Sequence, residues 1–161
     1  SFTKLMLMVE RELYYIAKSR LKDDDDVYDA IQETTIIAYK NIGKLKENQY
    51  FKTWLIRILI NETNLIYKRN KKRNLIPFEE IANAQSINDS SIEKSNIKLD
   101  FKFISNKLKE EDRTIVILYY MNRFTDKEIG EVLNLKINTV KTKRTRAIQK
   151  IKNIIEKGEN Y

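Results

Sequence analysis

Residues 125–152 carry the side chains whose types and spacing best fit a chemical task. Thr125 and Glu128 form a T-x-x-E pattern, which typically caps the start of a helix. Asn134 can end that helix, because Asn tolerates the left-handed backbone conformation found at many helix ends. A second helix is predicted from about Ile137, and its positive residues are Lys141, Lys143, Arg144, Arg146, Lys150 and Lys152. Two helices of this kind are typical of a helix-turn-helix that inserts its second helix into the major groove of DNA. The alternative is a helical hairpin with a solvated basic face.

The charge of the whole chain also favours a polyanionic partner. Its 161 residues carry a net charge of +8, and cations release counterions from nucleic acid when they bind phosphates. An anionic membrane surface would fit this charge equally well. No stretch of ~18 apolar residues is present, so no segment is expected to span a bilayer, and no signal peptide is visible. Cysteine and histidine are absent, which excludes disulfides, thiolate chemistry and histidine acid–base catalysis and argues against a zinc site. We therefore expect no cofactor, no metal site and no catalytic residues.

Residues that break helices are rare, which predicts an all-helical protein. The chain has three glycines and one proline, and these residue types most often interrupt helices. The proline lies in a polar stretch of weak apolar periodicity, so we interpret residues 74–96 as a linker. The prediction is an all-α protein of two small helical bundles, residues 1–73 and 97–161, the second containing the helix-turn-helix. We expect the two bundles to be able to move relative to each other.

Three helices are expected in the N-terminal half, at about residues 3–21, 27–42 and 49–70. Asp23–Asp26 form an acidic connector ahead of the second helix. Carboxylates at this place stabilise the positive end of the helix dipole, so capping is the preferred interpretation of the run. A metal site is the alternative, although it would need more oxygen ligands than the run presents.

The predicted third helix combines a polar stripe with a broad, mostly apolar face. The apolar face comprises Phe51, Trp54, Leu55, Ile58, Glu62, Leu65 and Ile66. The stripe recurs at spacings of four, three and four, which places its members on one side of the helix: Arg57, Asn61, Asn64 and Lys68. Positive side chains bind phosphates, and aromatic rings stack on bases. A basic stripe with aromatic neighbours therefore fits a single strand of nucleic acid. A solvated helix face explains the stripe equally well, and Trp54 is expected in the core more than as a stacking platform.

Both halves resemble the small bacterial RNA polymerase sigma factors of the extracytoplasmic-function (ECF) type, in the sigma-70 family. Residues 14–42 are similar to region 2 of that family, with an acidic connector followed by D-x-x-Q-E. Residues 51–69 continue this region with F-x-x-W-L-x-x-I-x-x-N and a basic tail. Residues 112–147 are similar to region 4, with D-R-x-x-x-x-L, E-I-(A/G)-x-x-L and T-V-K-x-(K/R)-x-x-R-A. The resemblance covers about residues 5–155, and the joint presence of the motifs in this order is specific.

The resemblance implies a sigma factor that directs bacterial core RNA polymerase to promoters and is not itself an enzyme. The D-x-x-Q-E face would bind a coiled coil of the polymerase clamp, through Asp29, Gln32 and Glu33. The third helix and the loop before it would hold the melted non-template strand of the −10 element, with one base flipped into a pocket of the loop. The candidate residues for this strand are Arg57, Asn61, Asn64, Lys68, Lys44 and Asn48.

Region 4 would place the predicted recognition helix in the major groove of the −35 element. The candidates at its exposed end are Asn138, Thr139, Lys141, Thr142, Thr145 and Arg146, since Asn favours adenine edges, Arg favours guanine and Lys mostly serves phosphates. The sequence departs from the family at Lys136, where a capping Ser is usual, and at Arg144, where an apolar residue is usual. Arg144 is expected to pack its stem and project its head toward a phosphate.

The family also implies partners and a location. Core RNA polymerase, promoter DNA and an anti-sigma protein, in some cases membrane-anchored, are the expected partners of a cytoplasmic protein without membrane insertion. A stand-alone helix-turn-helix regulator that binds duplex DNA without polymerase is the main alternative function. A metal-dependent nuclease lacks a second acidic cluster, and a membrane-surface bundle would need apolar faces that are better explained as bundle cores.

Overall fold

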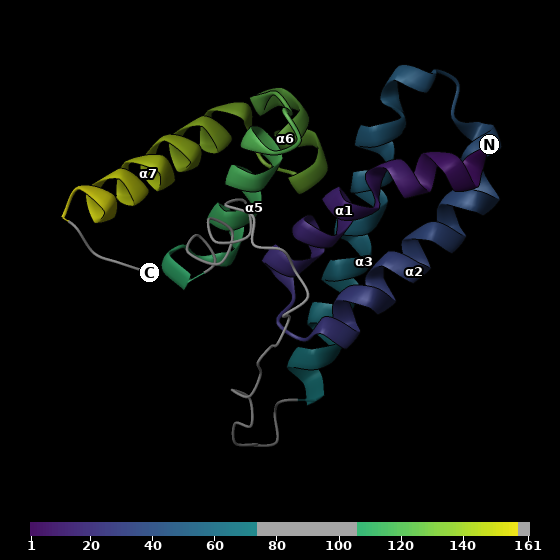
Figure 1. Cartoon of the computed structure of the whole chain (residues 1–161), viewed down its shortest axis with the longest axis horizontal. Helices are drawn as coiled ribbons and strands as arrows, with labels where there is room; N and C mark the ends of the chain where they lie inside the picture. The colour runs from purple at the N-terminus through teal and green to yellow at the C-terminus, as the bar shows by residue number, and fades with distance from the viewer. Residues whose placement is uncertain (74–105, 158–161) are drawn as a thin grey trace.

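The computed structural model is all-α and describes residues 1–73 and 106–157 (Figure 1). The elements, in chain order, are α1 (Phe2–Arg20), α2 (Asp24–Asn41), the 3-10 turns η1 (Ile42–Lys44) and η2 (Asn48–Tyr50), α3 (Phe51–Arg73), α5 (Glu110–Tyr120), α6 (Asp126–Leu133) and α7 (Ile137–Glu156). This confirms the predicted fold class. The predicted linker, residues 74–96, lies outside the described residues.

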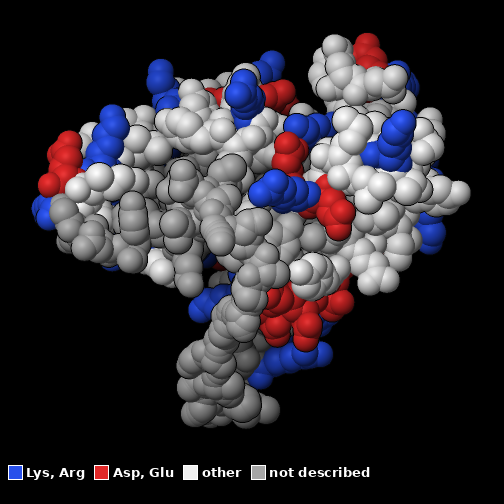
Figure 2. Space-filling view, viewed as in Figure 1, with Lys and Arg blue, Asp and Glu red and all other residues white. Residues whose placement is uncertain are grey.

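The acidic connector becomes part of α2. Asp23 is the N-cap, and its side chain accepts a hydrogen bond from the Asp25 backbone N–H at 2.9 Å. Asp24 pairs with Lys18 of α1 at 2.6 Å, and Asp26 accepts hydrogen bonds from Arg69 and Asn70 of α3. The second helix therefore begins three residues earlier than expected, because the carboxylates fill its first turn, where the helix dipole favours negative charge. Figure 2 shows acidic atoms gathered there beside the basic end of α3.

The third helix is longer than its apolar pattern indicates. The predicted end was Asn70, but α3 continues to Arg73 and includes the whole basic run. Lys71, Lys72 and Arg73 occupy its last turn, and cations are favoured at the negative end of a helix dipole. The basic tail is therefore a helical extension of α3.

A single large core joins α1, α2 and α3 to the C-terminal helices. Leu13, Val27 and Leu59 are buried in it from the first three helices, and Ile117 and Ile129 are buried in it from α5 and α6. Contacts between α1 and α5 and between α3 and α6 make this connection. A second, smaller cluster lies within the C-terminal half and consists of Leu108, Val116 and Ala147 with Ile148 and Ile151.

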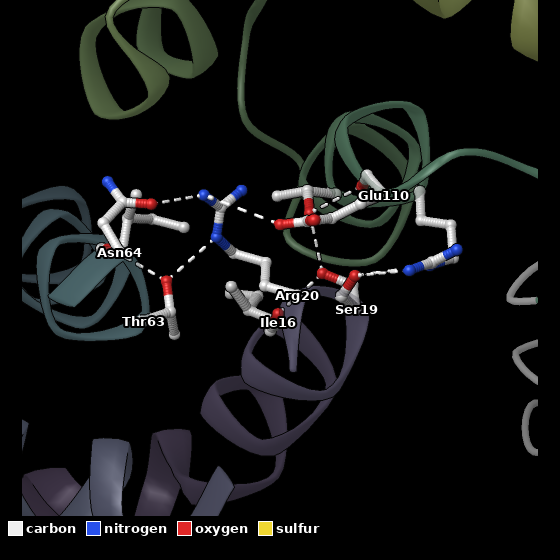
Figure 3. A network of polar contacts seen from close by, with 9 residues as sticks. Ile16, Ser19, Arg20, Thr63, Asn64 and Glu110 are labelled. Carbon is white, nitrogen blue, oxygen red and sulfur yellow. Dashed lines mark hydrogen bonds and ion pairs between the residues drawn. The ribbon is translucent and has the colours of Figure 1, made fainter. Parts of the chain in front are cut away.

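Polar contacts reinforce the junction of the two halves (Figure 3). The hydroxyl oxygens of Ser19 and Thr114 lie 2.8 Å apart, and both residues are 0 % exposed. Arg113 donates to the Ser19 backbone carbonyl at 3.1 Å. Arg20 lies 4.0 Å from Glu110. The expectation that the two bundles can move relative to each other did not include this packing. The apolar pattern of one helix does not reveal which distant helix will cover its apolar face.

Candidate polymerase and DNA interfaces

The predicted polymerase-binding residues border a groove between α2 and α3. Asp29, Gln32 and Glu33 are exposed on α2 and line one side of it. The other lining residues are Ile36 of α2 and Glu62, Leu65, Ile66 and Arg69 of α3, and the groove has a volume of about 500 Å³. The structure thus brings the three predicted residues together on an open, recessed surface.

Negative charge accumulates in this groove. Burial raises the pKa of the Glu62 carboxyl, and the nearby negative charge of Glu33 raises it further. A carboxylate next to another carboxylate is destabilised, and a cation close to both relieves the repulsion. The groove is therefore suited to a partner that brings positive charge together with apolar side chains.

Sequence reasoning missed the α3 side of the groove. Glu62 and Leu65 were assigned to the apolar face that packs into the bundle, but Glu62 lines the groove and Leu65 is 59 % exposed. Ile36 of α2 is exposed beside them. The available signal was that this apolar face is too broad to be covered by two neighbouring helices, so that one edge of it must face solvent.

The four stripe residues lie exposed along α3, and two of them contact other side chains or helices. Asn61 and Lys68 face solvent. The guanidinium of Arg57 donates to the backbone carbonyl of Glu131 in α6, at 3.4 Å. The side-chain oxygen of Asn64 accepts a hydrogen bond from Arg20 at 2.6 Å (Figure 3).

Arg20 connects the stripe to the junction of the two halves. Its Nε donates to Thr63 at 2.9 Å, so the same guanidinium holds two neighbouring residues of α3. Burial lowers the pKa of Arg20, while the negative charges of Glu110 and Glu111 act in the opposite direction. In this arrangement the stripe lies close to α5 and α6, and Arg57 lies directly against α6.

The remaining strand candidates are on the loop that leads into α3. Lys44 ends η1 and Asn48 begins η2, and both side chains are exposed. Trp54 is partly buried and packs against the core, and its ring centroid lies 6.0 Å from that of Phe51. Its position agrees with the expected core role.

The helix-turn-helix has the predicted local geometry. The Thr125 side chain accepts from the Glu128 backbone N–H at 3.1 Å, and the Glu128 carboxylate accepts from the Thr125 backbone N–H at 2.8 Å, so the capping box is complete. Asn134 is left-handed, with φ 59° and ψ 50°. The turn approaches α6 closely at Gly130, where a Cβ would lie 2.6 Å from the Leu135 carbonyl oxygen.

The recognition helix α7 presents its predicted DNA-facing residues to solvent. Asn138, Lys141, Thr142, Thr145 and Arg146 are exposed, and Thr139 is half-buried. Val140 and Ala147 on the opposite face are buried. In Figure 2, basic side chains are spaced along the edge that α6 and α7 form.

Arg144 does not point to solvent as expected. Its guanidinium donates to both carboxylate oxygens of Asp126, at 2.9 and 2.8 Å, and lies 4.1 Å from the ring centroid of Tyr119. The expectation that Arg144 projects toward a phosphate is therefore wrong for this conformation. The carboxylate partner is 18 residues away in the sequence, beyond the reach of any helix-periodicity argument.

Other kinds of site are not seen in the described part of the chain. Within residues 1–73 and 106–157 no group of three or more acidic, histidine or cysteine side chains could hold a metal ion. Over the same residues, no helix combines the length and apolarity that a membrane crossing requires. In the acidic run, Asp23 caps α2, and Asp24 and Asp26 form ion pairs with Lys18 and Arg69.

Comparison with known proteins assigns both halves. The sigma-70 region 2 model matches residues 5–73, and the sigma-70 region 4 model matches residues 103–151. The ECF RNA polymerase sigma factor SigW of Bacillus subtilis is 30 % identical, over 89 % of this chain and 82 % of the relative. The chain belongs to the ECF sigma factors of the sigma-70 family. SigM of Bacillus subtilis, another ECF sigma factor, is 25 % identical over 95 % of this chain and 94 % of its own length.

Solved structures show the same fold over nearly the whole ECF sigma factor chain. RpoE of Bartonella quintana, in complex with the anti-sigma factor NepR, has a TM-score of 0.72 at 22 % identity and covers 96 % of each chain. CnrH, in complex with the cytosolic domain of CnrY, has a TM-score of 0.65 at 19 % identity and covers 99 % of this chain and 89 % of its own. As a sigma factor, the protein is a non-catalytic subunit of RNA polymerase that recognises promoters and initiates transcription.

Proposed function

We propose that three separate surfaces of this sigma factor perform the steps of promoter recognition. The α2–α3 groove, with Asp29, Gln32 and Glu33, binds a coiled coil of core RNA polymerase. The exposed stripe of α3, together with Lys44 and Asn48, holds the melted strand of the −10 element. The exposed face of α7, from Asn138 to Arg146, enters the major groove at the −35 element.

The division of α3 between two surfaces is the observation that carries this proposal. Its groove residues, which include Glu62 and Leu65, and its stripe residues, which include Asn61 and Asn64, form two faces whose centres lie roughly a third of a turn apart at 3.6 residues per turn. Both sets reach solvent. One helix therefore holds polymerase and the DNA strand at the same time, which fixes the strand relative to the enzyme.

The chemistry of each surface suits its proposed partner. The groove offers carboxylates beside exposed Ile36 and Leu65, which fits a helical partner with basic and apolar side chains. The stripe offers one arginine, one lysine and two amides, which fits phosphates and base edges. The α7 face offers Asn and Arg for base edges with Lys for phosphates.

The test is reconstituted transcription with core polymerase on fragments of the source genome, with mapped start sites. Discrete start sites that require both components are expected. Asn61→Ala should reduce promoter opening and leave polymerase binding intact, whereas the matched Asn153→Ala variant near the end of α7 should change neither. Equal loss of both activities in Asn61→Ala would count against the stripe. Specific duplex binding without any dependence on polymerase would instead favour a stand-alone regulator.

An anti-sigma protein is the further partner that we propose, acting in the cytoplasm where polymerase and promoters are found. Support comes from RpoE and CnrH, whose structures were solved as complexes with NepR and with the cytosolic domain of CnrY. Purification of the tagged chain from unstressed source cells should yield a stoichiometric partner that blocks its binding to polymerase. If the tagged chain is recovered with polymerase and no other partner under all conditions, the proposal of an anti-sigma protein is contradicted. Membrane fractionation then decides whether that partner is anchored.

A further inference from the structure

The start of the recognition helix is weakly fixed by its own sequence. Lys136 is the N-cap residue of α7, and its side chain makes no capping hydrogen bond. The preceding turn is held at the end of α6, where the Leu135 backbone N–H donates to the Gly130 carbonyl at 2.9 Å. This contact fixes where α7 begins, but it leaves the direction of its axis to contacts further along the helix.

Arg144 makes one of those contacts, two turns into α7. Its Nε and Nη2 donate to the two carboxylate oxygens of Asp126, the first residue of α6. The same guanidinium lies over the ring of Tyr119 in α5, 4.1 Å from the centroid. Bidentate pairing and stacking both restrict the plane of the guanidinium. One side chain thus connects α5, α6 and α7.

The pair is partly buried and electrically balanced. The side chains of Arg144 and Asp126 are 15 % and 18 % exposed. The hydrogen bond from Arg144 lowers the pKa of Asp126, and the reciprocal bond raises the pKa of Arg144. Both groups are therefore charged at neutral pH and cancel each other. Arg144 adds little to the positive field that DNA meets.

The charges of α7 accordingly divide into two sets. Lys143 pairs with Glu111 of α5 at 3.2 Å, so that it too is directed toward the bundle. The remaining four positive residues are exposed: Lys141, Arg146, Lys150 and Lys152. Arg144 connects α7 to α5 and α6, Lys143 adds a partly exposed ion pair to α5, and the outer set is available to phosphates.

We infer that Arg144 is a positioning residue for −35 recognition, which sets the angle of α7 through Asp126 and Tyr119 and makes no contact with DNA phosphate. The inference rests on the proposed −35 role of α7. Recognition requires side chains to be held within about 0.5 Å and 10–20° of the productive geometry. Base contacts depend on that angle, whereas phosphate contacts from flexible lysines tolerate changes in it.

The test compares sigma–polymerase holoenzyme on promoter duplex and on the same duplex with a scrambled −35 element, over a series of salt concentrations. Arg144→Lys, Asp126→Asn and Tyr119→Leu should each lower the ratio of specific to scrambled affinity about tenfold, the size of one good base contact. The dependence on salt should stay as in the wild type for Arg144→Lys and Tyr119→Leu, which keep both charged groups. Lys141→Ala and Lys150→Ala should each reduce the salt slope by about one, because each removes an exposed positive charge that is available to phosphates.

Asp126→Asn separates the two possible roles of Arg144 by the sign of its effect. Loss of the carboxylate frees the guanidinium and removes a negative charge near DNA, so a phosphate-binding Arg144 would bind both duplexes more tightly in this variant. A positioning Arg144 gives weaker binding to the specific duplex. Tighter binding of Asp126→Asn to the specific duplex would overturn the inference.

Folding and the proposed function are controlled separately. Polymerase binding through the α2–α3 groove should be unchanged in all variants, and melting curves should show that they are folded at the assay temperature. Tyr119→Leu keeps both charged groups and so tests the geometry without an unpaired ion. If wild-type holoenzyme does not distinguish the two duplexes, the −35 role of α7 is wrong, and the inference is overturned with it. A normal wild-type ratio that all three variants retain overturns the inference alone.

Discussion

Glu33 and Glu62 show how single residues prepare a surface for a partner. They belong to different helices, yet the charge of Glu33 contributes to the raised pKa of Glu62. The unrelieved repulsion has a small cost in the free protein, and a basic partner removes it. The groove is therefore weakly destabilising until it is occupied.

A charge reversal at Glu33 tests this role. Glu33→Lys should weaken binding to core polymerase by tenfold or more, because like charges across an interface cost several kcal/mol. The control is Glu156→Lys, which makes the same charge change at the exposed end of α7. Surface binding measurements with core polymerase give both affinities. Unchanged affinity for Glu33→Lys would remove the groove from the polymerase interface.

The pH dependence of stability tests the Glu62 environment directly. A carboxyl whose pKa is raised in the folded state contributes most favourably at low pH, where it is protonated, and this contribution is lost as the pH rises through the folded value. Glu62→Gln should therefore raise the melting temperature at pH 7 and have little effect at pH 3. Thermal melts of the variant and of Glu156→Gln at both pH values provide the comparison. A larger gain at pH 3 than at pH 7 would contradict the assigned environment.

At the scale of elements, the two helices of the helix-turn-helix differ in how they begin. The start of α6 has a complete capping box, whereas α7 begins at Lys136 without a side-chain cap. The first backbone N–H groups of a helix have no partner within it, so a capping oxygen stabilises the helix. The recognition helix lacks that local stabilisation and depends on its packing against α5 and α6.

Lys136→Ser should supply the missing cap. A Ser at this position, with its extended backbone of φ −74° and ψ 149°, can accept from the first turn and stabilise the protein by about 0.5–2 kcal/mol. Lys136→Ala removes the same charge without adding an acceptor and serves as the matched control. In denaturant unfolding, Lys136→Ser should have a higher free energy of unfolding than Lys136→Ala. Equal stability of the two variants would show that the start of α7 gains nothing from a cap.

At the scale of the whole molecule, the two halves share a core and a buried polar junction. Ile117 of α5 and Leu13 of α1 lie in one cluster, and Arg57 of the stripe donates to α6. The DNA strand proposed to lie along α3 would need the place that α6 occupies beside Arg57. The proposed strand binding therefore requires the halves to separate.

A reversible crosslink tests this requirement. The sequence has no cysteine, and the Ser19 and Thr114 hydroxyls lie 2.8 Å apart, so Ser19→Cys with Thr114→Cys offers a disulfide across the junction. The oxidised protein should lose promoter opening, and dithiothreitol should restore it. Ser19→Cys alone, treated with the same oxidant, controls for damage to polymerase. Full opening activity with the disulfide formed would show that the halves need not separate.

The sequence by itself determined the features that depend on neighbouring residues. The capping box of Thr125 and Glu128, the left-handed Asn134 and the exposed face of α7 all follow from short spacings, because caps and helix faces repeat within a few residues. The order of the region 2 and region 4 motifs was likewise sufficient to indicate the family. The same local rules placed the starts of α6 and α7 correctly.

The tertiary structure alone decided the features that depend on distant residues. Glu62 and Leu65 line the groove because α2 covers only part of the apolar face of α3. Ser19 meets Thr114 across 95 positions of sequence, and Arg144 meets Asp126 across 18. No periodicity reports such pairings, since they depend on which helices pack together and at what angle. For this reason, only the tertiary structure identifies the α3 side of the groove, the junction of the halves and the inner position of Arg144.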